Sequence, residues 1–287
     1  MPLADSHSIE KLQRIALAIE YDGTFYSGWQ RQASPELPTV QSALERALSQ
    51  VAGTEIATTC AGRTDAGVHA TCQIIHFDSP VDRGSKAWIM GVNSLLPETI
   101  RVQWSQTVDA EFHARFSATA RQYFYIIYCS KVSSAVLHNK VTHSRDELNC
   151  EIMNEAAQNL LGEQDFSSFQ AAGCQSKSPG RFVEHARVFA QGPFLILDIK
   201  ANAFLQHMVR NIAGALLEIG REEQPIRQVF RSPADAVVDS SHCGGSPPGH
   251  REISLCNSVR GRFCKPDRRG YQSMVRGSRW EHASENY

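Results

Sequence analysis

The stretch Ala61-Gly62-Arg63-Thr64-Asp65-Ala66-Gly67-Val68-His69 guides the interpretation of the whole chain, because it holds a carboxylate on a turn bracketed by two glycines. The preceding residues 55–60 include β-branched side chains, which favour a strand. The two glycines accept backbone angles that other residues resist. We therefore expect Asp65 to project from a loop, with the cation Arg63 two residues before it. This arrangement is typical of a nucleophile presented to an anion.

Composition sets broad limits on the class of protein. The chain has 287 residues, 42% of them hydrophobic, and a formal net charge of −1. A near-neutral total argues against indiscriminate coating of nucleic acid, although a local basic cleft remains compatible with it. No apolar stretch approaches the length that spans a bilayer, and the N-terminus has no export signal, so a cytoplasmic protein is expected. The eight cysteines show no zinc-ligand spacing, so no metal site is expected.

Hydrophobic periodicity in the first part of the chain predicts an alternation of strands and helices. Ile15, Leu17 and Ile19 alternate with smaller or polar residues, as in a strand with one buried face. Thr39 can cap a helix that ends at Gly53. The expected elements are a strand over 15–19, a helix over 40–51, strands over 55–60 and 72–77, a helix over 85–96 and a strand over 100–104. This β-α-β-β-α-β order favours helices on one face of an antiparallel sheet.

A second unit with similar elements begins near Ser117. Its expected elements are an aromatic strand over 122–129, a helix over 152–161, strands over 182–189 and 194–199, and an apolar helix over 208–217. The two later strands are separated by a Gln-Gly-Pro turn at 191–193. Residues 170–180 are rich in Ser, Gly, Lys and Pro and form the clearest internal loop.

Several ordered motifs together resemble a known family. They are Tyr21-Asp22-Gly23, Gly28-Trp29-Gln30, Gly62 to His69, Phe112-His113-Ala114-Arg115-Phe116, Tyr123-Phe124-Tyr125, Asp165 to Phe169 and His207-Met208-Val209-Arg210-Asn211. Their residues and order are similar to those of the TruA-type tRNA pseudouridine synthases. A lone Arg-Thr-Asp-Ala-Gly would be weak evidence, because Asp is also a common turn residue.

The resemblance implies an α+β fold of two ferredoxin-like or RRM-like halves, whose antiparallel sheets join back to back around a central cleft. Residues 1–117 would form the N-terminal half that carries the Asp65 loop, and residues 118–231 the C-terminal half. The resemblance also implies a homodimer whose tRNA spans both subunits.

Pseudouridine formation detaches uracil from its ribose carbon, rotates the base and rejoins it through carbon. No redox change or group transfer is involved, so no cofactor is expected. Asp65 is the candidate nucleophile, attacking either the sugar carbon or the uracil ring. A carboxylate in a closed site needs a fixed cation to stay ionised. The resemblance assigns that ion pair to Arg210, base flipping to Arg63 and stacking on the flipped uracil to Tyr123. Strand alternation by itself does not distinguish Tyr123 from Tyr125.

RNA contacts are expected along the cleft. His113 and Arg115, with Arg121 nearby in the sequence, can bind phosphates, which position a substrate without reading its sequence. Phe112, Ala114 and Phe116 complete that contact segment, and residues 174–178, with Gln175 and Lys177, resemble a second one. Each segment could equally be a solvated loop.

The tail after Ser232 departs from the family pattern. Three of the eight cysteines lie between 243 and 264, and residues 244–287 carry eight basic and four acidic side chains. The family's closing strand, with Gly-Leu-Tyr-Leu or a similar sequence, was not found in residues 232–287. Either the tail has diverged or the reading frame was altered near Arg231. The segment is expected to be a solvated, disordered tail, with an RNA-binding arm as the alternative.

The combined prediction is an isomerase that converts uridine to pseudouridine at positions 38, 39 and 40 of the tRNA anticodon arm. The alternative is a noncatalytic RNA-binding protein or tRNA chaperone on the same fold, with the altered C-terminus disabling the pocket. A glycoside hydrolase using Asp65 would need a second carboxylate across the cleft, and no motif offers one.

Overall fold

The computed structural model describes residues 12–32, 37–171, 173–174, 176 and 178–222 with their side chains, and the backbone of Glu252–Val259. The elements of the first half are β1 (Gln13–Tyr21), η1 (Gly23–Phe25), α1 (Val40–Ala52), β2 (Thr59–Cys60), β3 (His69–Ser79), α2 (Gly84–Lys86), the π-helical turn η2 (Ala87–Gly91), α3 (Val92–Leu95) and β4 (Ile100–Val108). Those of the second half are β5 (Ala118–Cys129), β6 (Thr142–Ser144), α4 (Cys150–Gln158), β7 (Gly162–Asp165), η3 (Ser167–Phe169), β8 (Gly180–Gln191), β9 (Phe194–Ala201) and α5 (Met208–Gly220).

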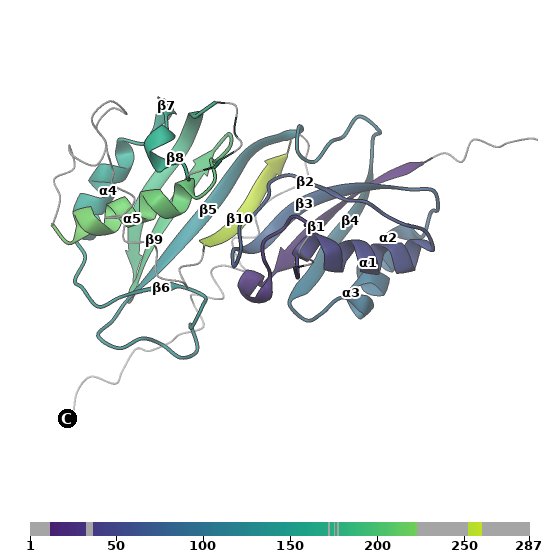
Figure 1. The fold of residues 1–287 in the computed structure, drawn as a ribbon, viewed down its shortest axis with the longest axis horizontal. Coiled ribbons are helices and arrows are strands. Elements are labelled where there is room, and N and C mark those ends of the chain that lie inside the picture. The colour runs from purple at the N-terminus through teal and green to yellow at the C-terminus, as the bar shows by residue number, and fades with distance from the viewer. Residues whose placement is uncertain are drawn as a thin grey trace, which may run out of the picture.

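The described strands form one sheet in the order β4-β1-β3-β10-β5-β9-β8-β7, with β2 on β3 and β6 on β5. Strand β10 (Glu252–Val259) joins the two halves, because it runs parallel to β3 and antiparallel to β5. Figure 1 shows this strand in yellow between the two halves. Within each half the main strand pairs are antiparallel, which confirms the predicted α+β class with two antiparallel units.

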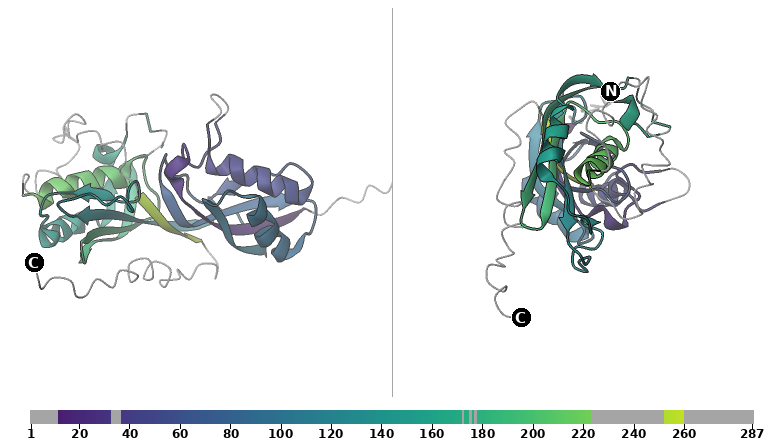
Figure 2. Two further views of the ribbon diagram at one scale, coloured as in Figure 1. Left: turned by 90° about the horizontal axis from the view of Figure 1, so that it is seen from below. Right: turned by 90° about the vertical axis from the view of Figure 1, so that its left-hand side faces the viewer.

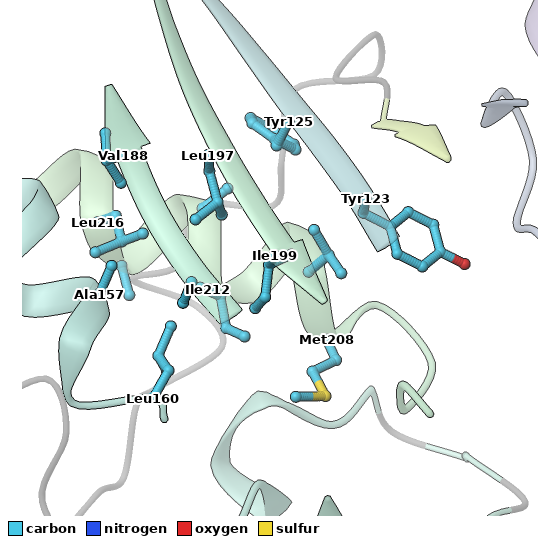
Figure 3. Packing of buried hydrophobic residues seen from close by; sticks show 14 of the residues in the cluster. Tyr123, Tyr125, Ala157, Leu160, Val188, Leu197, Ile199, Met208, Ile212 and Leu216 are labelled. Atoms are coloured by element: carbon cyan, nitrogen blue, oxygen red, sulfur yellow. The ribbon is translucent and has the colours of Figure 1, made fainter. Parts of the chain in front are cut away.

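Helices α1 and α5 lie on the same face of the sheet, one over each half (Figure 2). Helix α1 begins at the predicted cap, where the Thr39 side chain accepts a hydrogen bond from the Ser42 backbone, and ends at the left-handed Gly53. Its apolar residues join the core of the first half. In the second half, α4 and α5 pack on β5, β8 and β9 through the residues labelled in Figure 3.

Strand β1 is buried on both faces, so the prediction of one buried face is wrong. Ile15 and Leu17 enter the main core of the first half. Ala18, on the other face, packs in a small cluster with Ala61, Ile74 and Ala114. The small alanine side chains let the segments that carry Ala61 and Ala114 pack closely on the second face of β1. The alternation of residues along β1 does not indicate that this second face is covered.

Two other elements differ from their predicted form. Of the strand expected over residues 55–60, only Thr59–Cys60 forms a strand, which is β2 and pairs with β3. The expected 85–96 helix contains a π-helical turn in its middle. The short strands β6 and β7 were not predicted. The boundary proposed at residue 117 lies between β4 and β5, and the division into domains stays a prediction.

The C-terminal tail contains a strand, β10, that the sequence analysis does not predict. Residues Glu252–Val259 pair with β5 from Ala118 to Tyr125, so this edge of β5 is covered within the described residues. Ile253, Leu255 and Val259 fall on one phase of a two-residue period, with Asn257 interrupting it, and this is the signal that was overlooked. The remainder of residues 232–287 lies outside the described part of the chain.

Two further findings concern the described residues. Within them, no helix has both the length and the apolar character needed to cross a bilayer. Their five cysteines are all free thiols, at positions 60, 72, 129, 150 and 174.

Candidate active site

The Asp65 loop, residues 61–68 between β2 and β3, is held by the segment that follows β1. The Trp29 backbone N–H donates to the Thr64 carbonyl at 3.0 Å. The Gly67 N–H donates to the Tyr26 carbonyl at 3.2 Å. Because these bonds join backbone atoms, they fix the path of the loop without depending on its side chains.

Two glycines of this anchoring segment allow a close approach to the Asp65 loop. A Cβ on Gly23 would lie 2.0 Å from the Val68 carbonyl oxygen, and a Cβ on Gly28 would lie 2.8 Å from that of Thr64. Gly28 also has a φ of 95°, in the left-handed region that favours glycine. The Tyr-Asp-Gly and Gly-Trp-Gln motifs therefore have a physical reason in this chain, because their glycines make room for the loop.

The loop opens into a cleft of about 1270 Å³ between the two halves. Its wall includes the four arginines Arg63, Arg115, Arg121 and Arg181. Among its described lining residues, Asp65 is the only acidic side chain. A wall that contains four arginines and one carboxylate suits a polyanionic substrate, even though the chain as a whole has a net charge of −1. The described part of this wall does not offer the second carboxylate that a glycoside hydrolase requires.

Asp65 lies at the surface of the cleft with its side chain 39% exposed. Its Oδ2 is 3.8 Å from Nε2 of His207, the residue that precedes α5. His207 has a φ of 61°, which is uncommon for a residue other than glycine. Val68, at the end of the loop, is buried in the core of the second half. The loop thus belongs to the first half by sequence and packs against the second.

Tyr123 is the aromatic residue of strand β5 that lines the cleft. Its side chain is 8% exposed and packs edge to face on Phe204, with ring centroids 4.9 Å apart. Tyr125 lies on the same face of the strand, but its hydroxyl accepts a hydrogen bond from Thr142 inside the protein. Figure 3 shows Tyr123 at the margin of this apolar cluster. The structure therefore distinguishes two tyrosines that strand alternation could not.

Arg121 ties three chain segments together at the base of the cleft. One terminal nitrogen donates to the Asn202 carbonyl at 2.7 Å, and the other to the carbonyls of Ala61 at 2.6 Å and Arg115 at 3.2 Å. Burial lowers the pKa of this guanidinium. Its predicted phosphate contact stays a prediction, and its observed role is to hold the start of the Asp65 loop against both halves.

Residues 112–116 divide between the cleft and the interior. His113, Arg115 and Phe116 line the cleft. Ala114 is fully buried and Phe112 packs against the same small cluster, so these two support the segment from behind. Direct substrate contact by them stays a prediction.

Of the remaining predicted site residues, the structure describes Arg210 but not Gln175 and Lys177. Arg210 is half-buried in the first turn of α5, directly after Met208 and Val209, which line the cleft. Its ion pair with Asp65 stays a prediction. Gln175 and Lys177 lie outside the described residues. Within the described residues, no group of three or more His, Cys, Asp and Glu side chains is arranged to hold a metal ion.

Comparison with known proteins places this cleft in a family. The family model described as tRNA pseudouridine synthase matches residues 17–117 and 156–232. The chain belongs to the tRNA pseudouridine synthase family. Proteins named tRNA pseudouridine synthase A from Shewanella denitrificans and Aeromonas hydrophila are 54% and 53% identical to it. These matches cover 76% and 75% of this chain and 83% and 80% of the relatives. A Shigella sonnei protein of the same name is 55% identical over 75% of this chain and 79% of its own length.

The tRNA pseudouridine synthase model covers some of the predicted site residues and leaves others outside the match. Its first part contains the Asp65 loop and the segment 112–116, and its second part contains Arg210. Arg121 and Tyr123 lie between the two matched parts, so their assignment rests on this chain's own geometry and on the motif resemblance. The matched region ends at residue 232, where the atypical tail begins.

The sequence analysis missed several residues that shape this pseudouridine synthase cleft. His207 was quoted only as a motif member, yet it is the basic side chain placed beside Asp65. The Tyr21 hydroxyl lies 2.7 Å from Thr64 Oγ1 and secures the middle of the loop. The Gln73 side chain donates to the Gly62 carbonyl. Such contacts join residues more than ten positions apart, so no local pattern could have identified them.

Replacing Gly23 with alanine should destabilise the protein and displace the Asp65 loop, because the new Cβ would collide with the Val68 carbonyl. We expect a loss of roughly 2 kcal/mol in unfolding free energy, in the range for overpacked sites. Urea denaturation measures this change.

Gly214→Ala is the matched control, because a Cβ there meets nothing within 4 Å in the interior of α5. It should gain up to about 1 kcal/mol from helix propensity. Unchanged stability in Gly23→Ala would contradict the close approach described for this glycine.

Proposed function

We propose that this chain isomerises uridine to pseudouridine at positions 38, 39 and 40 of the tRNA anticodon arm, with Asp65 as nucleophile. The observation that carries the proposal is one carboxylate among four arginines in the cleft, on a loop within the region matched by the tRNA pseudouridine synthase model. The positive wall suits an RNA backbone, and the carboxylate is the group that can attack a sugar or a base.

The reaction exchanges one bond for another within a single nucleotide. The N1–C1′ bond breaks, the uracil rotates, and a C5–C1′ bond forms. The proton on C5 leaves and N1 gains a proton, so atoms and electrons balance without an oxidant. Attack by the Asp65 carboxylate, on C1′ or on the uracil ring, divides this exchange into two easier steps. The half-exposed carboxylate is accessible to a nucleotide that enters the cleft.

The neighbouring side chains have separate roles in this proposal. Arg210 supplies the cation that keeps Asp65 ionised once a bound nucleotide has displaced water. Tyr123 offers its ring to the flipped uracil from the wall of the cleft. Arg63 is exposed and lines the same cleft, so its planar guanidinium can occupy the space that the uridine leaves. Extrusion of a base from a helix costs a few kcal/mol, which these contacts must offset.

Contacts with the rest of the RNA are proposed for the basic and polar residues along the cleft. Arg115 is exposed and His113 is half-buried in the cleft wall, where both can meet a phosphate backbone, and Arg121 lines the same cleft. Gln175 and Lys177 are proposed for the second contact segment on the basis of the family resemblance. Phosphate contacts of this kind position the substrate without reading its sequence.

The proposed working form is a homodimer in the cytoplasm, because a tRNA is larger than one cleft and the family resemblance implies that its RNA spans two subunits. Sedimentation of the purified chain with tRNA tests this form. A complex that contains a single protein chain would contradict it. The noncatalytic alternative depended on a missing closing strand, and β10 occupies the edge of β5 where that strand was expected to be absent.

Asp65→Asn should abolish isomerisation and leave tRNA affinity within about twofold, because the amide keeps the shape of the side chain but is not a nucleophile. Tritium release from tRNA labelled at uridine C5 measures turnover. The control is Asp109→Asn, an exposed carboxylate away from the cleft, which should retain full activity. Residual activity of Asp65→Asn above about one per cent, a loss smaller than roughly 3 kcal/mol, would exclude Asp65 as the nucleophile.

Arg63→Lys should slow single-turnover isomerisation at least about tenfold with little change in tRNA affinity. Lysine keeps the positive charge but lacks the planar fork that can stack and bond in place of a base. Arg46→Lys, an exposed arginine on α1, should behave as wild type. If Arg63→Lys reacts at the wild-type rate with saturating enzyme, charge alone is sufficient at this position and the flipping role is wrong.

A further inference from the structure

An exposed aromatic ring stands in the cleft without a role in the proposed reaction. Phe116 is 77% exposed, and among the exposed large apolar side chains of the described residues it is the one that lines the cleft. Its ring stacks on His113, with centroids 4.2 Å apart and an angle of 27° between the planes. One face of the ring is therefore supported by protein, and the side chain leaves most of its surface to solvent.

The support beneath this ring is rigid. The Phe116 backbone N–H donates to Nδ1 of His113 at 3.3 Å, and the Ser117 N–H donates to the His113 carbonyl at 2.7 Å. The turn therefore fixes the His113 ring and the backbone that carries Phe116. The His113 ring also packs against the ring of His76, and the two ring centroids are 4.8 Å apart.

His76 secures the same turn from the sheet. Its Nδ1 accepts a hydrogen bond from the Ala114 backbone N–H at 3.1 Å. Burial, aided by nearby Arg14 and His113, lowers the pKa of His76 to about 4. The imidazole is therefore neutral at pH 7, and its Nδ1 remains an acceptor. A platform held in this way loses little conformational entropy when a flat ligand lands on it.

The charge beside the platform indicates the chemistry of that ligand. The Arg115 guanidinium lies 5.8 Å from the centre of the Phe116 ring and also lines the cleft. A flat apolar ring next to an exposed cation suits a nucleotide, whose base stacks while its phosphate pairs with the arginine. The exposed position of Phe116 contrasts with the buried position of Tyr123, so the two aromatic rings offer separate places for bases.

We propose that Phe116, supported by His113, stacks on an unpaired base of the tRNA other than the target uridine. This inference rests on the proposed function and adds a base-stacking site to a segment for which only phosphate contacts had been expected. When the target uridine leaves its helix, its neighbours lose a stacking partner. A fixed aromatic ring in the cleft replaces that partner for one of them and holds the opened RNA in register.

Substitution at Phe116 separates stacking from charge. Phe116→Leu should weaken binding of an unmodified tRNA transcript between about fivefold and hundredfold, the range that corresponds to ~1–3 kcal/mol for one stacked base. Phe116→Tyr should restore it. The slope of log affinity against log salt should not change in Phe116→Leu, whereas Arg115→Gln should make it shallower by about one. KM should rise while kcat stays near wild type.

Two controls exclude a structural cause. Phe25 is 73% exposed and does not line the cleft, so Phe25→Leu should bind tRNA as wild type does. Because Phe116 is exposed, Phe116→Leu should also keep the wild-type melting temperature. Wild-type tRNA affinity in Phe116→Leu, or failure of Phe116→Tyr to restore binding, would overturn the proposal.

Single abasic nucleotides in the anticodon arm identify the stacked base. At one position the abasic replacement should weaken binding to the wild-type protein by at least fivefold, and should have almost no effect on binding to Phe116→Leu. If the losses from Phe116→Leu and from each abasic replacement simply add, Phe116 stacks on no base. These measurements record binding alone. Absence of tritium release by the wild-type protein would therefore count against the proposed function and leave the stacking result to be decided separately.

Discussion

The close backbone contact between the segment after β1 and the Asp65 loop is the constraint on which the rest of the site depends. Two glycines allow the two segments to approach closely, and the backbone hydrogen bonds from Trp29 and Gly67 hold them together. The loop is consequently fixed before any side chain of the cleft is considered. Arg121 extends the same principle to the second half, because its guanidinium bonds the carbonyl of Ala61 at the start of the loop. A carboxylate whose loop is held by backbone atoms needs little reorganisation when a substrate binds.

Much of this architecture could be predicted from local patterns, and the reasons for the failures are physical. Helix α1 was readable because Thr39 and Gly53 mark its two ends. The burial of both faces of β1 was not predictable, because Ala16 and Ala18 look like the outward positions of an amphipathic strand. Strand β10 does not contain the family's closing motif, and the alternation of apolar and polar residues in its sequence is incomplete, so it is hard to predict. Strand alternation could not separate Tyr123 from Tyr125, because the cleft that distinguishes them is formed by residues distant in sequence.

The charge distribution explains how a nearly neutral chain can present a site for a polyanion. The basic side chains that line the cleft are balanced by acidic groups elsewhere, so the net value conceals the local field. Two of the four cleft arginines illustrate different uses of the same side chain. Arg63 is exposed, whereas Arg121 has its terminal nitrogens bonded to carbonyls and its pKa lowered by burial. An inventory of positive charges along a cleft therefore overstates the number available to RNA.

The position of β10 has a consequence for the order in which this protein can be made. The strand that joins the two halves of the sheet is also the last described element of the chain, and it pairs with residues more than a hundred positions earlier. During synthesis each half can assemble its own core from strands already present, but the continuous sheet must wait until residues 252–259 leave the ribosome. Pairing over such sequence distances is slow, because a long loop must close before any bond forms. The continuous sheet therefore forms late, once residues 252–259 are available to pair with β3 and β5.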